Sequence, residues 1–422
     1  MVKNSKKILY FVVLVCLSIL ILVYAINKSN NILFCATLLL CCANILQSKV
    51  SMFSIFTLII TYIVLPVFVQ DNFGRSYGVL ESSKLPLYAK EIYTYVSVFL
   101  FLLFTFITFT RILKKEKSLY KTNFYISNKI LYTFCAGAII FSIVAFPRLP
   151  FISSSRPRFE MLLPGGAWNH LALVFLIAIS CRYKNSWCAR LTGCFVCFWF
   201  LGNGERVDIL GYVVGVMLFF LNRHKLKKLH YIQLIFVACI GIIILNFIGD
   251  VRSNSNNGLS GLIYEFVVQK TATDIAYVFN CCIHYSQNNL LYGSTYSYYL
   301  LNAFPILNAE NQVMKILEGF ASPGGEYLLC EPLINFGFIG IIVTTIAEFS
   351  FLSLIFSSRD KYFKYIAIFV IFTQFRIIWY GRSYIETAII YFIPFLILIK
   401  SVLEMRVKSH TATQQKKKVK NT

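Results

Sequence analysis

The chain has 422 residues, of which 58% are hydrophobic and only 14% charged, and its formal net charge is +22. A soluble globular domain carries roughly a quarter charged residues, so the composition excludes an ordinary soluble enzyme. Apolar runs of about 20 residues, each enough to cross a bilayer core of roughly 30 Å, recur along the whole length. The sequence therefore predicts an all-α polytopic membrane protein that has the lipid bilayer as a partner.

About twelve transmembrane helices fit these runs. They lie near residues 8–26, 32–46, 51–69, 91–110, 130–146, 168–181, 191–203, 208–221, 231–248, 331–356, 365–379 and 385–400. The first run lacks a cleavage site with small residues, so it is expected to be a span and not a signal peptide. The chain then divides into a membrane domain (1–248, about nine spans), a large loop (249–330), three last spans (331–400) and a basic tail (401–422).

The positive charge follows this topology. Lysine-rich segments such as 111–129, 222–230 and the tail alternate with segments that hold most of the acids. This is the pattern of the positive-inside rule, so it predicts cytoplasmic N- and C-termini and an extracytoplasmic 249–330 loop. It also argues against nucleic acid as a partner. The 13 cysteines show no metal-ligand spacing, so neither a metal site nor a cofactor is predicted.

A short hairpin brings charged residues to the predicted outer side. The run 191–221 is too short for two full spans, which need about 40 residues. The turn Gly202-Asn203-Gly204-Glu205-Arg206-Val207-Asp208 is therefore expected to lie below the outer surface, against protein or a wet cavity. In the alternative interpretation, a helix that starts near Trp187 lifts the turn outwards, and Glu205 and Asp208 pair with Arg206 in an exposed hairpin.

A second short hairpin, 365–399, places Arg376, Arg382 and Glu386 near its outer turn. Ionisable residues inside spans are costly and are functional by default. Arginine binds phosphate groups through paired hydrogen bonds, which makes Arg376 and Arg382 candidate anion ligands. The alternative is a structural ion pair between Arg376 and Glu348, which lies at comparable depth in the preceding span.

The long loop is predicted to contain amphipathic helices and a tyrosine-rich part. From Leu259 to Cys282 the apolar positions follow nearly helical spacing, as in a helix that lies on a membrane or caps a cavity. Tyrosines follow at positions 285, 292, 296, 298 and 299. Aromatic rings of this kind serve as platforms for sugar faces or as anchors at the membrane interface.

Three titratable side chains are candidate catalytic residues. Glu326 follows a Ser-Pro-Gly-Gly break, and Glu331 precedes Pro332 at the start of the next span. Either suits a general base or a group that orients a hydroxyl, although Glu331 also suits a charge that complements the helix dipole. His170, near the outer end of its span, is the third candidate, with a packing role as its alternative.

The stretch Gly324-Gly325-Glu326-Tyr327 through Asn335-Phe336-Gly337-Phe338-Ile339-Gly340 resembles the loop-to-span boundary of bacterial O-antigen and capsular repeat-unit polymerases, the Wzy family, and of the related O-antigen ligases. The Gly-Glu-Arg turn at 204–206, the span count and the late external loop are also similar to that family. The chain differs from the ligases because it lacks a His-Asn pair before the glycine-rich helix start.

The resemblance implies a metal-independent glycosyltransferase of the bacterial cytoplasmic membrane. Such an enzyme moves a growing glycan from undecaprenyl pyrophosphate onto a newly flipped, lipid-linked repeat unit at the outer face. A chain-length regulator and a flippase are the protein partners that the resemblance implies. Candidate ligands for the pyrophosphate are Arg206, Arg252, Arg376 and Arg382, with Arg156 and Arg158 in reserve. Candidate bases are Glu326, Glu331 and His170.

Two alternative functions remain at this point. A flippase for lipid-linked oligosaccharides also has about a dozen spans, but transporters usually show internal repeats and polar residues near the bilayer midplane. Here the polar groups gather at the predicted outer boundary. An O-antigen ligase shares the chemistry and differs in the acceptor.

Overall fold

The structure is a computed structural model that describes residues 2–75, 78–121, 127–147, 149, 168–180, 186–223, 269–302, 312–320, 325–381 and 386–404. The elements in these ranges are all helices, and the one β-like pairing is an isolated bridge between Glu326 and Tyr380. Within the same ranges, seven helical segments are long and apolar enough to cross a membrane. The all-helical membrane architecture is therefore confirmed, while the number of about twelve spans stays a prediction.

The helices run in chain order as follows: α1 (Val2–Asn27), α2 (Asn30–Ser48), α3 (Met52–Tyr62), α4 (Val64–Phe73), α5 (Gly78–Ser82), α6 (Ala89–Phe109), α7 (Ile112–Tyr120), α8 (Asn128–Ala145), α9 (Trp168–Ser180), α10 (Trp187–Gly202), α11 (Arg206–Arg223), α14 (Lys270–Asn288), α15 (Ser294–Asn302), α16 (Gln312–Glu318), α17 (Cys330–Ser357) and α18 (Lys361–Tyr380). A last helix covers 386–404 and contains the π-helical turn η2 (Ala388–Phe392). The predicted run 231–248 and the part of the loop before residue 269 lie outside the described residues.

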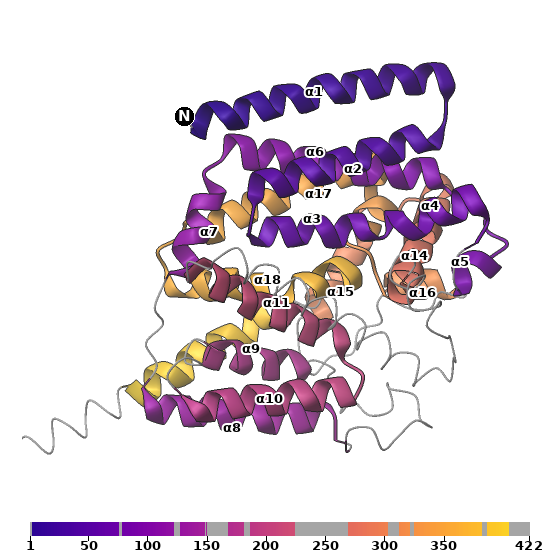
Figure 1. Ribbon diagram of the computed structural model, residues 1–422. Helices are drawn as coiled ribbons and strands as arrows, with labels where there is room; N and C mark the ends of the chain where they lie inside the picture. Colours follow the sequence, from indigo (N-terminus) through magenta and orange to yellow (C-terminus); the bar gives the residue numbers. More distant parts are fainter. Residues whose placement is uncertain are drawn as a thin grey trace, which may run out of the picture.

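The long helices form two groups (Figure 1). The first contains α1, α2, α3, α6 and α17, and the second contains α8, α9, α10 and the 386–404 helix. Helix α18 connects the groups, because it contacts α11 and α9 on one side and α17 and α3 on the other. The start of α1 and helix α7 lie at one end of the bundle, while α5, α14 and α16 lie at the opposite end.

Polar side chains hold the first group together. Thr37 of α2 bonds the Ser97 hydroxyl of α6 at 2.8 Å, Asn44 donates to the Leu100 carbonyl at 3.0 Å, and Gln47 donates to Thr108 at 2.7 Å. In lipid the apolar side chains provide no hydrophobic drive between helices, so such interhelical hydrogen bonds contribute to their association.

Two glycines set the contact between α11 and α18. A Cβ atom at Gly211 would lie 2.5 Å from the Phe372 carbonyl oxygen, and one at Gly215 would lie 2.6 Å from the Phe372 ring. Small residues let helix backbones approach closely in membranes. This approach places the start of α11 beside the last turn of α18.

Helix α17 matches the span predicted over 331–356, but it is interrupted at Gly337. Gly337 has φ 62° and ψ −150°, which breaks the helix, and a Cβ atom at Gly340 would lie only 2.2 Å from the Pro332 carbonyl oxygen. Residues 330–336 thus form a short helical segment that packs against the start of the longer one. The chain changes direction at Gly337, which needs a positive φ, and its backbone packs closely at Gly340. Glycine meets both requirements, which explains the glycine-rich motif.

Helix α14 packs inside the protein. Each residue from Ile275 to Ile283 is buried, and the helix contacts α17, α5, α4, α6 and α16. Its buried Asn280 accepts a hydrogen bond from the Tyr88 N–H and donates one to the Pro86 carbonyl. This stretch is buried on both faces, so it is not the surface helix that the spacing suggested.

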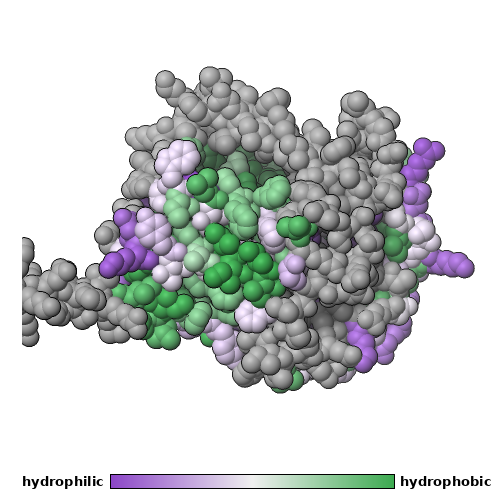
Figure 2. Space-filling view, turned by 90° about the horizontal axis from the view of Figure 1, so that it is seen from below, coloured by the Kyte–Doolittle hydropathy of each residue, from purple (hydrophilic) through white to green (hydrophobic). Residues whose placement is uncertain are grey.

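Apolar side chains also cover outer surfaces of the bundle. Figure 2 shows such a surface over the lowest helices of Figure 1, α8 and α10. The exposed large apolar residues of these helices are Tyr132, Ile140, Ile143, Trp187, Leu191 and Phe198. Exposed apolar patches of this extent mark contact with a membrane or another protein, and a bilayer fits the span lengths.

Candidate functional site

Arg376, in the last turn but one of α18, is the centre of a buried ion cluster. Its Nη1 atom lies 2.6 Å from Glu205 Oε1, and its Nε atom lies 3.8 Å from Asp208 Oδ1. Its guanidinium carbon stands 4.6 Å from the centre of the Tyr380 ring, one turn further along the helix. A planar guanidinium suits such a combination of carboxylate and aromatic neighbours.

Helix α9 completes the cluster from a third direction. Asn169 donates a hydrogen bond from Nδ2 to Asp208 Oδ2 at 3.2 Å, and His170 lies within the electrostatic influence of both Asp208 and Arg376. Both α9 residues are buried. The cluster therefore joins α9, α11, α18 and the α10–α11 turn.

The α10–α11 turn is a buried element. Glu205 is 2% exposed and Asp208 1%, so the interpretation as an exposed hairpin is wrong. Helix α10 does begin at Trp187, as one alternative supposed, but the turn is nevertheless packed against protein. Its carboxylates contact Arg376 of α18, the arginine for which the sequence suggested Glu348 as a structural ion partner. Carboxylates buried in this way require a cationic partner, because an unpaired buried charge is strongly unfavourable.

Glu326 reaches the end of α18 by a backbone pairing. The Glu326 N–H donates to the Trp379 carbonyl at 3.1 Å, and the Leu328 N–H donates to the Ile378 carbonyl at 2.8 Å. The Glu326 carboxylate lies directly over Gly381, where a Cβ atom would be 2.6 Å from Oε2. A side chain at position 381 would displace this carboxylate, whose residue is 2% exposed. Glu326 thus pairs with the end of α18, about one helical turn from Arg376, although 50 positions of sequence separate the two residues.

Glu331 belongs to a second polar cluster. Its Oε1 accepts a hydrogen bond from the Thr295 hydroxyl at 3.0 Å, and that hydroxyl also accepts one from Asn335 Nδ2 at 2.7 Å. Asn335 in turn receives the Gly293 N–H on Oδ1 at 2.9 Å. Glu331 lies in the first turn of α17, which is also favourable for the helix dipole. The main visible role of this cluster is to fix the turn between α14 and α15 on the 330–336 segment.

The candidate residues that the structure describes lie near the ends of their helices. His170 is in the first turn of α9, Asp208 in the first turn of α11, Arg376 near the end of α18, and Glu326 just before α17. None of these four stands at the middle of its helix. The arrangement is that of a site at the end of the bundle.

The arginines predicted as pyrophosphate ligands have different environments. Arg376 is buried and paired with carboxylates, whereas Arg206, the first residue of α11, is half-buried. Arg252 and Arg382 lie outside the described residues, as do Arg156 and Arg158. Of the four, Arg206 is therefore the described arginine whose side chain reaches solvent.

Sequence reasoning did not assign roles to Asn169 and Tyr380. Asn169 directly precedes His170 at the start of an apolar run, and Tyr380 follows Arg376 by one helical turn. A polar residue next to a candidate histidine, and an aromatic residue four positions from a span arginine, are the signals that could have identified them.

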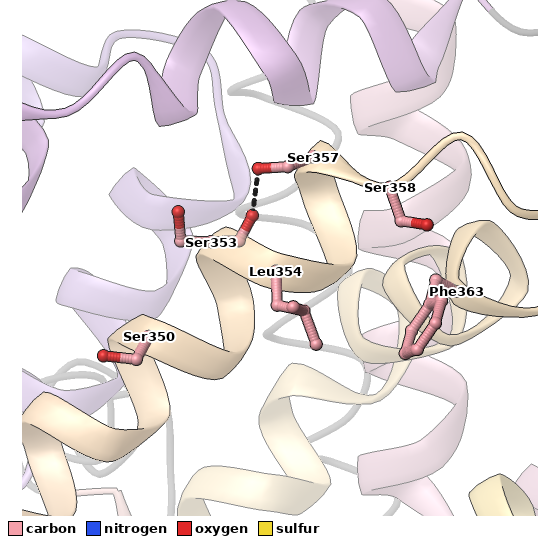
Figure 3. A pocket seen from close by; sticks show the side chains of 6 residues that line it. All are labelled: Ser350, Ser353, Leu354, Ser357, Ser358 and Phe363. Carbon is pink, nitrogen blue, oxygen red and sulfur yellow. Dashed lines mark hydrogen bonds between the residues drawn. The ribbon is translucent and has the colours of Figure 1, made fainter.

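A surface hollow of about 490 Å³ lies at the opposite end of α17 (Figure 3). It is lined by Ser350, Ser353, Leu354, Ser357, Ser358 and Phe363. Lys115 of α7 donates a hydrogen bond to the Ser357 hydroxyl there. The lining has hydroxyl groups but neither a carboxylate nor a guanidinium, and 20 residues of α17 lie between Glu326 and Ser350, so the hollow is not part of the candidate site.

Within the described ranges no group of three or more His, Cys, Asp or Glu side chains is arranged to hold a metal ion. The described candidate residues are carboxylates, one histidine and arginines. No protein-family model, no curated protein and no solved structure matches this chain.

Proposed function

We propose that this protein is a membrane glycosyltransferase that polymerises lipid-linked oligosaccharide repeat units into O-antigen or capsular polysaccharide. The observation that carries the proposal is the meeting of Glu326 with the end of α18, one helical turn from the Arg376 cluster. A glycosyl transfer of this kind needs a carboxylate for the acceptor hydroxyl and cations for the leaving pyrophosphate. Both residue types occur here together, and the resemblance to the Wzy polymerases supplies the substrate class.

In the proposed reaction, Glu326 accepts the proton of the acceptor sugar hydroxyl. The hydroxyl oxygen attacks the anomeric carbon of the growing glycan, and the bond from that carbon to undecaprenyl pyrophosphate breaks. The carrier leaves with the bonding electron pair. Arg206 contacts its pyrophosphate from the start of α11, where free backbone N–H groups also favour an anion.

The Arg376 cluster has a positioning role in this proposal. Arg376 already has Glu205 and Asp208 as partners, so its charge fixes the turn that carries Arg206. His170 lies within the electrostatic influence of the same cluster, and Glu331 fixes the start of α15 through Thr295. Glu326 is thus the proposed base, and Glu331 and His170 are proposed to act through their neighbours. Arg252 and Arg382 remain proposed ligands of the same pyrophosphate.

The location also belongs to the proposal. The enzyme is placed in the bacterial cytoplasmic membrane with both termini in the cytoplasm and with the 249–330 loop outside. In this orientation the helix ends that carry Glu326 and Arg376 face outwards, where flipped lipid-linked units arrive. A chain-length regulator and a flippase are the proposed partners.

The test is a gel of the surface glycan from cells that lack the gene. Collapse of the ladder to a single repeat unit, with restoration by the intact gene, is expected of a polymerase. Loss of all surface glycan, the single unit included, would instead indicate a flippase or an O-antigen ligase. Lipid-linked units trapped at the inner face would then identify the flippase.

Single-residue variants sharpen this test. Complementation with Glu326→Gln or Arg206→Ala should give the collapsed ladder while the protein stays in the membrane at its normal level. Lys84→Ala, a change at a cation between α5 and α6, is the matched control and should restore the full ladder. Normal ladders from both Glu326→Gln and Arg206→Ala would show that the proposed site is wrong.

A further inference from the structure

Tyr292 has an unusual backbone and an exposed ring. It lies in the connection between α14 and α15 with φ +48°, and it is 79% exposed. A positive φ is a real outlier for a bulky residue that is neither glycine nor asparagine. The other described non-glycine residues with positive φ are Lys28 and Lys49, which directly follow the C-terminal ends of α1 and α2.

Hydrogen bonds to the 330–336 segment hold Tyr292 in this conformation. The Tyr292 N–H donates to the Asn335 carbonyl at 3.0 Å, and the Leu291 N–H donates to the Ile334 carbonyl at 3.0 Å. On the other side, the Gly293 N–H donates to Asn335 Oδ1, and a Cβ atom at Gly293 would lie 3.2 Å from the Phe336 ring. The turn is therefore fixed from both sides while the Tyr292 ring points away from the protein.

The exposed ring contributes little to folding, because an apolar surface that stays in contact with solvent gains no burial energy. Strained residues persist where the surroundings hold them, and they cluster at binding sites. An aromatic pair lies next to this turn. The Tyr296 ring stacks on Phe336 with centroids 6.3 Å apart and planes 16° from parallel. This pair lies beside Gly293, the residue that directly follows Tyr292.

The neighbouring surface is apolar. Beyond Phe336, α17 exposes Phe338, Ile339 and Val343. A ligand that contacts both Tyr292 and this face must be polar enough for an aromatic platform at one end and apolar at the other. A lipid-linked saccharide has this character.

We propose that Tyr292, together with the stacked pair Tyr296 and Phe336, forms an aromatic subsite for the saccharide of the lipid-linked substrate, with the prenyl chain along the exposed face of α17. This inference rests on the proposed function. A ring fixed in one orientation suits a ligand of definite shape, whereas a fluid bilayer interface does not require a strained backbone.

The test measures binding separately from activity. Asparagine tolerates a positive φ, so Tyr292→Asn removes the ring and keeps the turn. The probe is the oligosaccharide released by mild acid from the host's own lipid-linked pool, titrated against the full-length protein in nanodiscs. Loss of aromatic stacking should weaken binding roughly 3- to 10-fold, without lowering the Tm. The control is Lys49→Gly, which relieves a positive φ at another position and should leave the affinity unchanged.

The other outcomes separate the subsite from the polymerase proposal. Unchanged affinity in Tyr292→Asn would overturn it. A lower Tm in nanodiscs with unchanged affinity would identify Tyr292 as a bilayer anchor. If wild type binds the oligosaccharide through Tyr292 but does not polymerise it, the polymerase proposal fails and the subsite stands. If wild type does not bind the oligosaccharide at all, the subsite is wrong.

Discussion

The two ends of the bundle each bury carboxylates, and they stabilise them differently. At the end that carries α7, Glu116 accepts hydrogen bonds from the Met52 N–H of α3 and from the Tyr120 hydroxyl. At the opposite end, Glu205 and Asp208 share the guanidinium of Arg376. Glu116 is thus held by neutral donors, with Lys117 as a weaker influence, whereas the other two are held by a buried cation.

Glu116 therefore makes a structural contact between helices, whereas Glu205 and Asp208 belong to a charged cluster. Burial raises the pKa of Glu116 from 4.5 to about 7, and the hydrogen bonds from Tyr120 and Met52 only partly oppose the shift. Its charge therefore changes near neutral pH. The carboxylates beside Arg376 have a fixed counter-charge, which suits a site that must present a stable charge arrangement to a substrate.

The largest expected effect follows from removal of the cation. Arg376→Ala leaves two buried carboxylates without their partner, so it should lower the free energy of unfolding by about 3–5 kcal/mol. Thermal unfolding of the purified protein in detergent measures this. Arg359→Ala, at an exposed arginine between α17 and α18, is the control and should change the Tm little. The triple variant Arg376→Met, Glu205→Met, Asp208→Leu should recover much of the stability, because it leaves no unpaired charge; equal loss in both variants would contradict the ion-cluster explanation.

Glu116 should make stability depend on pH. Because its pKa is higher in the folded than in the unfolded protein, the folded state binds the proton more tightly between pH 4.5 and about 7. Stability should therefore fall as the pH rises through this window, by up to about 3 kcal/mol, and level off above it. Tm values from pH 5 to 8 test this. Glu116→Gln should flatten the profile, while Glu404→Gln, at an exposed carboxylate, should keep it; a profile that Glu116→Gln leaves unchanged would disprove the assignment.

A smaller effect is expected at the contact between α11 and α18. Gly211→Ala places a methyl group against the Phe372 carbonyl, so it should cost about 1–3 kcal/mol and move the start of α11 away from Arg376. Both the Tm and polymer length should decrease. Val213→Ala, on the exposed side of α11, serves as the comparison and should affect neither by much. Normal polymer length in Gly211→Ala would show that the helix spacing does not matter for the site.

The smallest expected effect concerns the start of α3, next to Glu116. Ser51 caps this helix, with its hydroxyl accepting from the Ser54 N–H and the Ser54 hydroxyl reaching back to Ser51. Ser51→Ala should cost about 1 kcal/mol, and Ser51→Asp, which keeps an N-cap acceptor, should cost less. Thermal unfolding resolves the two. Equal losses would mean that the cap contributes nothing through its hydrogen bond.

The sequence predicts many of the residues that form the site, but not which of them are in contact. The short hairpin 191–221 correctly indicated that the 202–208 turn is not an ordinary exposed loop, since its carboxylates are buried. The same reasoning singled out Arg376 as an ionisable residue within a span. It could not show that these residues are partners, because 171 positions separate Glu205 from Arg376 and helical periodicity carries no information about distant pairs.

The sequence identifies the glycine-rich motif but does not predict its backbone geometry. The sequence places Gly337 and Gly340 in a boundary motif at the start of a span, but it does not predict where the helix breaks. Both residues are compatible with helix at the level of sequence, and only the positive φ of Gly337 and the close approach of Gly340 to Pro332 reveal the reversal. For α14, helical spacing indicates one apolar face, whereas tertiary packing covers both, so the interpretation as a helix lying on the membrane surface is wrong for the described part.

The sequence by itself determined the helical membrane class, the position of most helices and the segments that hold the charges. These properties follow from local composition, because a bilayer admits only long apolar helices and orients them by their flanking cations. Tertiary structure alone decided that Glu326 lies over Gly381, that Arg376 pairs with the α10–α11 turn and that Tyr292 is held in a strained turn by Asn335. These contacts join distant parts of the chain, and they depend on helix spacing within a few tenths of an ångström, which is set by packing of the whole bundle.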